Sequence, residues 1–126
     1  MDFLAPCATG EMFGIGDVGR LRCRAIAGGA NNPLVDDSVA FRMHSAGVLY
    51  VPDLLSNAGG VIQNAVEFNH LGLDALNELL SAANSRTKAV LEDASRANVT
   101  PLGIARSEAL ALVTSGAGND QEARDS

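Results

Sequence analysis

The sequence has little of what nucleic-acid and metal binding require. Only 4% of its 126 residues are aromatic, tryptophan is absent, and 15 acidic residues outnumber nine Lys and Arg, for a net charge of −6. The basic residues include a single lysine, Lys88, and form no cluster, so we expect no nucleic-acid partner. The two histidines, His44 and His70, lack the spacing of metal ligands, so we expect no metal site.

Long hydrophobic runs are also absent. No apolar run reaches the roughly 18 residues of a membrane span, and the first residues form neither the basic start nor the apolar stretch of a signal peptide. We therefore expect a cytoplasmic protein. In that compartment Cys7 and Cys23 are expected to be reduced thiols rather than a disulfide.

The residues that are present predict one α/β domain. Three short apolar runs, at residues 2–5, 24–27 and 48–51, are each closed by Pro or Gly, a pattern typical of buried parallel strands. Residues 34–46 predict a helix between the last two runs, ended by Gly47. Strand, helix and strand in this order form a βαβ crossover.

The second half of the chain predicts helices. Asn57 is a candidate N-cap for a helix over 58–69, and apolar residues at three- and four-residue spacing predict an amphipathic helix of about six turns over 76–94. Thr100 caps a last helix, which is expected to end before Gly116. The Gly-, Asn- and acid-rich residues 114–126 predict a disordered tail.

Gly14, Gly16 and Gly19 follow the order G-x-G-x-x-G, which opens many dinucleotide-binding units. That motif needs a strand directly before it and a helix directly after it. Here the preceding predicted strand ends at Ala5, and only residues 20–22 separate Gly19 from the next strand. We therefore interpret these glycines as part of a loop and not as a phosphate site.

Four other stretches are more specific: DFLAPCATG at 2–10, AIAGGANNPLVDD at 25–37, HSAGVLYVPDLLSNAGGVIQ at 44–63 and NVTPLGIAR at 98–106. Their order and spacing resemble the C-terminal half of the dehydrogenases that act on leucine, valine and phenylalanine, relatives of glutamate dehydrogenase. The resemblance implies the second half of a Rossmann-type parallel sheet, about three strands, followed by C-terminal helices. Residues 1–113 would then form a partial NAD-binding domain.

The resemblance implies reversible NAD-dependent oxidative deamination of an apolar L-amino acid to a 2-oxo acid and ammonia. In the family, the catalytic lysines and aspartate belong to an N-terminal domain that this chain does not match. Lys88 is expected on the polar side of its helix, where it lacks the burial that makes lysine a base. We therefore expect no catalytic residue here, and an isolated chain that is inactive and binds NAD weakly.

The resemblance also places two groups of residues at the carboxyl ends of the predicted strands, where open α/β sheets bind ligands. Cofactor contacts are implied at Cys7, Ala8, Ala30, Asn31 and Asn57. Substrate contacts are implied at Asn32, Gly60, Val61, Asn64 and Ala65.

Simpler interpretations of the same residues remain open. Cys7 is equally explained as a small buried residue, residues 31–33 as a turn and helix cap, and Asn57 as a cap. The glycine pair 59–60 is harder to explain, because each glycine costs a helix about 1 kcal/mol.

Two departures from the family leave the amino-acid substrate open. Asn64 replaces an apolar pocket residue, and Val66 replaces an acidic residue before Glu67. An unpaired buried amide costs about 1 to 3 kcal/mol, so Asn64 either meets a polar group or lies outside the pocket.

The first predicted strand, residues 2–5, has no partner on one side within this chain. A bare apolar edge invites pairing, so we expect it to bind either the N-terminal half of the enzyme or a second copy. The alternative function is a non-catalytic truncated α/β module that binds a nucleotide, a small acid or a protein partner.

Overall fold

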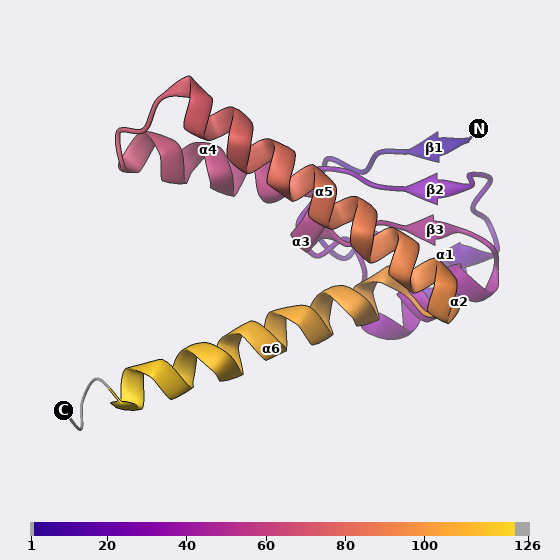
Figure 1. Ribbon diagram of the computed structural model, residues 1–126. Helices are drawn as coiled ribbons and strands as arrows, with labels where there is room; N and C mark the ends of the chain where they lie inside the picture. Colours follow the sequence, from indigo (N-terminus) through magenta and orange to yellow (C-terminus); the bar gives the residue numbers. More distant parts are fainter. Residues whose placement is uncertain (1, 123–126) are drawn as a thin grey trace.

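The computed structural model describes the backbone of residues 2–122 and the side chains of residues 2–115. Its sheet contains three parallel strands, β1 (Phe3–Leu4), β2 (Ala25–Ile26) and β3 (Leu49–Tyr50), in the order β1-β2-β3 (Figure 1). Phe3 pairs with Ala25, and Ala25 pairs with Leu49. The three predicted strands are therefore confirmed, and they are in parallel register.

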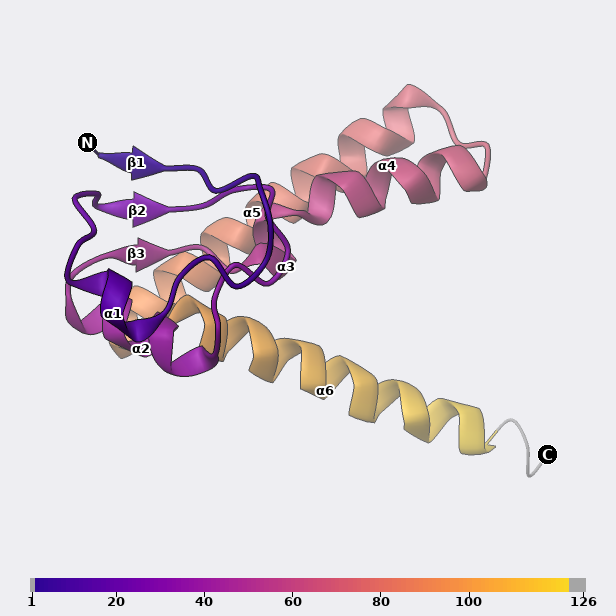
Figure 2. The ribbon, with the colours of Figure 1, turned by 180° about the vertical axis from the view of Figure 1, so that it is seen from behind.

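The helices lie on both sides of this sheet. They are α1 (Ile15–Val18), α2 (Asp37–Ser45), α3 (Asp53–Ser56), α4 (Ala58–Phe68), α5 (Leu73–Ala97) and α6 (Pro101–Glu122). The short helices α1 and α2 lie on one side and α5 on the other, while the α4–α5 hairpin and the far end of α6 extend away from the sheet (Figures 1 and 2). Among the described residues, no helix is both long enough and apolar enough to span a membrane.

The main core lies between the sheet and α2. Ile26, Val39 and Met43 are each 0% exposed, and Val39 and Met43 are four residues apart on the inner face of α2. The helix begins at Asp37, three residues later than predicted, because Asp36 caps it by accepting a hydrogen bond of 2.8 Å from the Ser38 amide. Hydrogen bonds from Ser38 lower the pKa of the Asp36 carboxyl, as expected for a cap.

A second, smaller core joins α3, α5 and α6. It contains the buried side chains of Leu55, Val90 and Ala105. The predicted Thr100 cap is confirmed, since its hydroxyl oxygen accepts a hydrogen bond of 3.1 Å from the Gly103 amide. This core fixes α3 to the two long helices.

Helix α6 ends later than the sequence predicts. It continues to Glu122, whereas we expected it to end before Gly116 and residues 114–126 to form a disordered tail. Adding a residue to an existing helix is far easier than starting one, and no proline interrupts the segment. The two glycines near its end therefore do not stop the helix, and residues 123–126 lie outside those described.

The glycines at positions 14 to 19 do form a loop and a short helix. Gly14 caps the four-residue α1, and its amide donates to the Asp17 carboxylate at 2.9 Å. The preceding residue, Phe13, forms only an isolated bridge to Leu34 and no named strand. The motif thus lacks the strand that a phosphate-binding turn requires.

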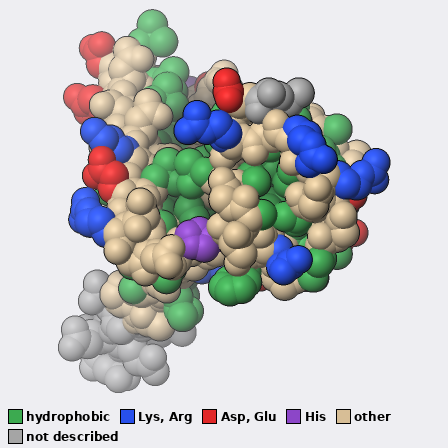
Figure 3. Space-filling model, turned by 90° about the vertical axis from the view of Figure 1, so that its right-hand side faces the viewer, with side chains coloured by type: hydrophobic (Ala, Val, Ile, Leu, Met, Phe, Trp, Pro, Cys, Tyr) green, Lys and Arg blue, Asp and Glu red, His purple; other side chains and the backbone are tan. Residues whose placement is uncertain are grey.

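The face at the amino-terminal ends of the strands differs in charge from the chain as a whole. Lys and Arg side chains surround a hydrophobic area on this face, although the net charge of the chain is −6 (Figure 3). Arg20, Arg22 and Arg24 come from the connection between α1 and β2 and are exposed. The candidate site residues lie at the opposite ends of the strands.

The carboxyl ends of β1 and β2 approach each other closely. The Ala30 amide donates a hydrogen bond of 3.0 Å to the Pro6 carbonyl. A Cβ atom on residue 28 would overlap the Pro6 carbonyl oxygen and lie 2.6 Å from the Pro6 nitrogen. Only glycine therefore fits at position 28 without moving one of these two loops.

We predict that Gly28→Ala destabilises the chain by about 3 kcal/mol, because both clashing groups are backbone atoms that cannot turn aside. Gly29→Ala is the matched control, since a Cβ there meets only the Cys7 sulfur at 3.7 Å. It should change stability by less than about 0.5 kcal/mol. Urea unfolding measures both, and equal effects of the two variants would show that the close approach is absent.

The only tyrosine of the sequence, Tyr50, reports on the core in alkaline solution. Burial, followed by the neighbouring Asp53 carboxylate, raises its pKa from 10.0 to about 12. Below pH 10 the phenol is neutral whether the chain is folded or unfolded; above it the unfolded chain ionises first. We therefore predict that about 3 kcal/mol of stability is lost as pH rises from about 10 to about 12.

Ultraviolet absorbance of the tyrosinate measures this ionisation directly, because no tryptophan and no second tyrosine contribute. The native chain should titrate well above pH 10, and the urea-unfolded chain near the ordinary value of about 10. Coincident titration curves would contradict the buried placement of Tyr50.

Candidate functional site

Three segments that follow the three strands meet at one edge of the sheet. They are residues 6–8 after β1, residues 28–32 after β2 and residues 52–57 after β3. Parallel strands end at the same edge, so the chain brings together motifs that are far apart in sequence. The Ser56 hydroxyl donates to the Gly28 carbonyl at 2.9 Å and fixes the third segment against the second.

Asn57 forms the centre of this cluster. Its Nδ2 donates to the Asn31 Oδ1 at 2.6 Å and to the Ala30 carbonyl at 3.3 Å. Its side chain does not cap α4, so that interpretation is wrong. The reason is that α3 leads into α4 through Asn57 itself. An ordinary N-cap residue has an extended backbone, and the backbone of Asn57 is not extended.

The other side-chain atom of this amide is a buried acceptor with no hydrogen-bond partner. Asn57 Oδ1 is the only such buried side-chain atom among the described residues. The two oxygens facing Nδ2 determine which way the amide points. An unpartnered buried acceptor costs about 1 to 3 kcal/mol, so this amide oxygen is the unsatisfied polar group of the strand-end cluster.

Asn32 adopts a left-handed turn, with φ of 46°. The backbone N–H of Asn32 donates to Asp53 Oδ2 at 2.7 Å, and Asp53 Oδ1 accepts from the backbone N–H of Leu54 at 3.0 Å. The turn interpretation of residues 31–33 is therefore right, but the cap of α2 is Asp36. We did not predict the role of Asp53.

The remaining predicted cofactor residues differ in exposure. Cys7 and Ala8 are exposed, so the alternative of a buried Cys7 is wrong. Ala30 is only 3% exposed, and its carbonyl rather than its methyl group takes part in the cluster. Cys7 and Cys23 are both free thiols, as expected.

The predicted substrate residues other than Asn32 lie together on α4. All four are exposed, and they share one face of the helix because they occupy positions i, i+1, i+4 and i+5: Gly60, Val61, Asn64 and Ala65. Asn64 is thus not buried within this chain, and no desolvation cost arises there. A Cβ on residue 60 would meet no atom within 4 Å, so packing within the chain does not require this glycine.

A groove of about 410 Å³ lies beside this face, between α3, α4 and α5. Leu54, Ala58 and Val61 form one wall, and Leu79 and Ala83 form the other. Sequence reasoning did not identify it, because the pairing of α4 with α5 is needed to form both walls.

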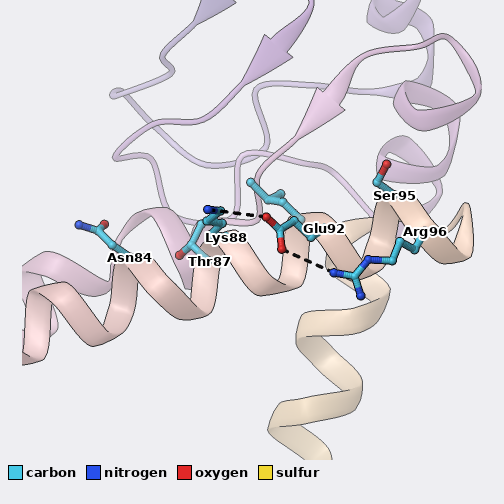
Figure 4. Close-up of a pocket in the computed structure, with 7 residues that line it drawn as sticks. Asn84, Thr87, Lys88, Glu92, Ser95 and Arg96 are labelled. Atoms are coloured by element: carbon cyan, nitrogen blue, oxygen red, sulfur yellow. Dashed lines mark ion pairs between the residues drawn. The ribbon is translucent and has the colours of Figure 1, made fainter.

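A larger hollow of about 790 Å³ lies on α5, and the lysine in its lining is not a buried general base (Figure 4). Its Lys88 side chain is 78% exposed and forms an ion pair of 3.8 Å with Glu92, which also pairs with Arg96 at 3.6 Å. Lys88 therefore lies on the polar face, as predicted.

Comparison with known proteins identifies relatives of this chain. Residues 1–109 match the profile of the Glutamate/Leucine/Phenylalanine/Valine dehydrogenase family. The valine dehydrogenase of Streptomyces coelicolor is 33% identical over 105 residues, which cover 83% of this chain and 29% of that enzyme. The leucine dehydrogenase of Thermoactinomyces intermedius is 41% identical over 66 residues, which cover 52% of this chain and 18% of that enzyme.

Solved structures give the same picture. The L-tryptophan dehydrogenase of Nostoc punctiforme superposes with a TM-score of 0.77 at 30% identity, covering 83% of this chain and 32% of that one. The hetero-hexameric glutamate dehydrogenase of Thermus thermophilus shares the fold, with a TM-score of 0.64 at 21% identity. The expected Rossmann-type parallel sheet followed by helices is confirmed, and the chain spans less than a third of these relatives. It belongs to the Glutamate/Leucine/Phenylalanine/Valine dehydrogenase family of oxidoreductases.

Proposed function

We propose that the chain is the C-terminal NAD-binding segment of an amino-acid dehydrogenase. In complete form this enzyme would carry out the reversible NAD-dependent oxidative deamination of an apolar L-amino acid to a 2-oxo acid and ammonia. The observation that carries the proposal is the buried, unpartnered Oδ1 of Asn57 at the strand-end edge of a chain from this family.

The residues at this edge fit the nicotinamide end of the cofactor. A carboxamide carries an NH₂ donor, and Asn57 Oδ1 is an acceptor that no residue in the described part of the chain uses. Asn31 and the Ala30 carbonyl hold the Asn57 amide in that orientation. The exposed residues Cys7 and Ala8 would lie along the bound NAD, which supplies the hydride acceptor.

The exposed face of α4 fits the substrate side. Asn32 lies between this face and the cofactor residues in the proposed arrangement, with Gly60, Val61, Asn64 and Ala65 lining the side-chain pocket. Neither Gly59 nor Gly60 is required by contacts within the chain, since the closest atom to a Cβ at Gly59 is 3.8 Å away. Two glycines in a first helical turn are then best explained by a molecule that approaches the backbone.

Two further properties follow from the proposal. The catalytic groups would come from the part of the enzyme that this chain does not match, so the isolated chain should neither deaminate amino acids nor bind NAD tightly. The free edge of β1, where Phe3 is 55% exposed, would pair with that part or with a second copy. The free thiols of Cys7 and Cys23 fit a reducing compartment, for which we propose the cytoplasm.

A chimera tests the function. The segment of the Streptomyces coelicolor valine dehydrogenase that matches this chain is replaced by the chain, and NADH formation is measured with apolar L-amino acids. We expect turnover by the chimera and none by the chain alone. A folded chimera without turnover, together with a chain that binds a nucleotide or small acid by itself, would favour the non-catalytic module instead.

In the chimera, Asn57→Ala should raise the KM for NAD by about five-fold to 150-fold, the equivalent of one buried hydrogen bond of about 1 to 3 kcal/mol. Steady-state kinetics with varied NAD measures the change. Asn77→Ala is the matched control, because Asn77 is exposed on α5 and should leave KM unchanged. An unchanged KM in the Asn57 variant would remove the main support for the proposal.

Gly60→Ala should separate stability from function. The added methyl group has no atom of the described residues within 4 Å and replaces a poor helix former, so the variant should be more stable by about 0.5 to 1 kcal/mol. In the chimera the same methyl group should raise the KM for the amino acid. Thermal unfolding and kinetics measure the two effects, and a stabilised variant with unaltered kinetics would show that α4 does not face the substrate.

A further inference from the structure

The strand-end cluster depends on a carboxylate to which the sequence analysis assigned no role. Asp53, the first residue of α3, has both carboxylate oxygens occupied: Oδ2 accepts from the Asn32 amide at 2.7 Å and Oδ1 from the Leu54 amide at 3.0 Å. Two backbone donors, one on each oxygen, fix the orientation of the carboxylate. One of these donors lies 21 positions away in the chain, so Asp53 joins two strand-end segments.

The Asn32 turn needs this support. Its φ of 46° lies in the left-handed region, which is unfavourable for residues other than glycine, although asparagine tolerates it better than most. A charge-assisted hydrogen bond to the Asn32 amide offsets that cost. Without Asp53 the turn would keep only its other backbone contact, the hydrogen bond of 2.7 Å that the Asn32 carbonyl accepts from the Glu11 amide.

This turn also orients the side chain of Asn57. Asn31 precedes Asn32, and its Oδ1 accepts the shortest hydrogen bond of the Asn57 amide, at 2.6 Å. Asp53, Asn32, Asn31 and Asn57 therefore form a closed ring that begins and ends in the same segment after β3. If Asn31 moves away, the Asn57 amide keeps only its longer bond of 3.3 Å to the Ala30 carbonyl and is freer to turn over.

We propose that Asp53 is a positioning residue that sets the hydrogen-bonding direction of Asn57. With the ring closed, Asn57 presents an acceptor, which suits a ligand with an NH₂ donor. With the ring open, the amide presents either its oxygen or its NH₂ group, and the preference for a donor is lost. The inference rests on the proposed NAD site, and it adds that cofactor discrimination there is controlled by a residue that does not touch the cofactor.

The test compares two cofactors in the chimera described above. NAD has the carboxamide NH₂, whereas its 3-acetylpyridine analogue has a methyl group in that place. The ratio of their dissociation constants, measured by calorimetry, reports the direction of Asn57. We expect the folded wild-type chimera to prefer NAD by about ten-fold, in line with one hydrogen bond, and Asp53→Ala to reduce this ratio to near one.

Variants separate positioning from a general loss of structure. Asp53→Asn keeps an oxygen that can accept from the Asn32 amide and should retain most of the preference for NAD. Asn31→Ala breaks the ring at its other member and should lose the preference as Asp53→Ala does, so it replaces that variant if Asp53→Ala does not fold. Asp93→Ala, which removes an exposed carboxylate on α5, should leave the ratio unchanged.

Hydrogen exchange on the chain itself tests the ring without any cofactor. The backbone N–H of Asn32 should exchange slowly in the wild-type chain and rapidly in Asp53→Ala. Equal rates would overturn the proposal. An unchanged cofactor ratio in both Asp53→Ala and Asn31→Ala would also overturn it. If the backbone N–H of Asn32 exchanges slowly in Asp53→Ala as well, but the chimera binds NAD normally, the positioning role fails and the proposed function stands. A wild-type chimera that binds neither cofactor would instead refute the NAD site, and the positioning role with it.

Discussion

The close approach of Gly28 to Pro6 is the contact on which the strand-end site depends. It brings the loop after β2 against the loop after β1, where the Ala30 amide and the Pro6 carbonyl then bond at 3.0 Å. Once that loop is fixed, the segment after β3 bonds to it through Ser56, Asn57 and Asp53. The close backbone packing at Gly28 thus determines where the polar residues of the site lie.

The strands and most helices could be predicted because their signals are local. Apolar runs closed by Pro or Gly located the three strands, and Thr100 followed by proline located the start of α6. The errors arose where neighbouring structure overrides a local rule. Asn57 was expected to cap α4, but a cap needs an extended backbone, and α3 runs into α4 at that residue.

The site was predictable only in part for the same reason. Motifs at the ends of parallel strands must meet at one edge, so Asn31, Asn32 and Asn57 could be grouped without coordinates. The bond between Asp53 and the Asn32 amide crosses 21 positions and depends on a left-handed turn, which one sequence does not reveal. The available signal was an acidic residue directly after the third strand, at the edge that already held the asparagines.

The exposed surfaces of the chain indicate that it forms only one side of the proposed site. The proposed cofactor side is ordered by hydrogen bonds within the chain, whereas no described residue covers the outer edge of β1 or the exposed α4 residues Gly60, Val61, Asn64 and Ala65. Buried parallel strands are normally paired and covered, and substrate pockets are normally enclosed. On our proposal both uncovered surfaces are therefore contact surfaces for the rest of the dehydrogenase, so that orientation of the cofactor and enclosure of the substrate are supplied by different parts of the enzyme.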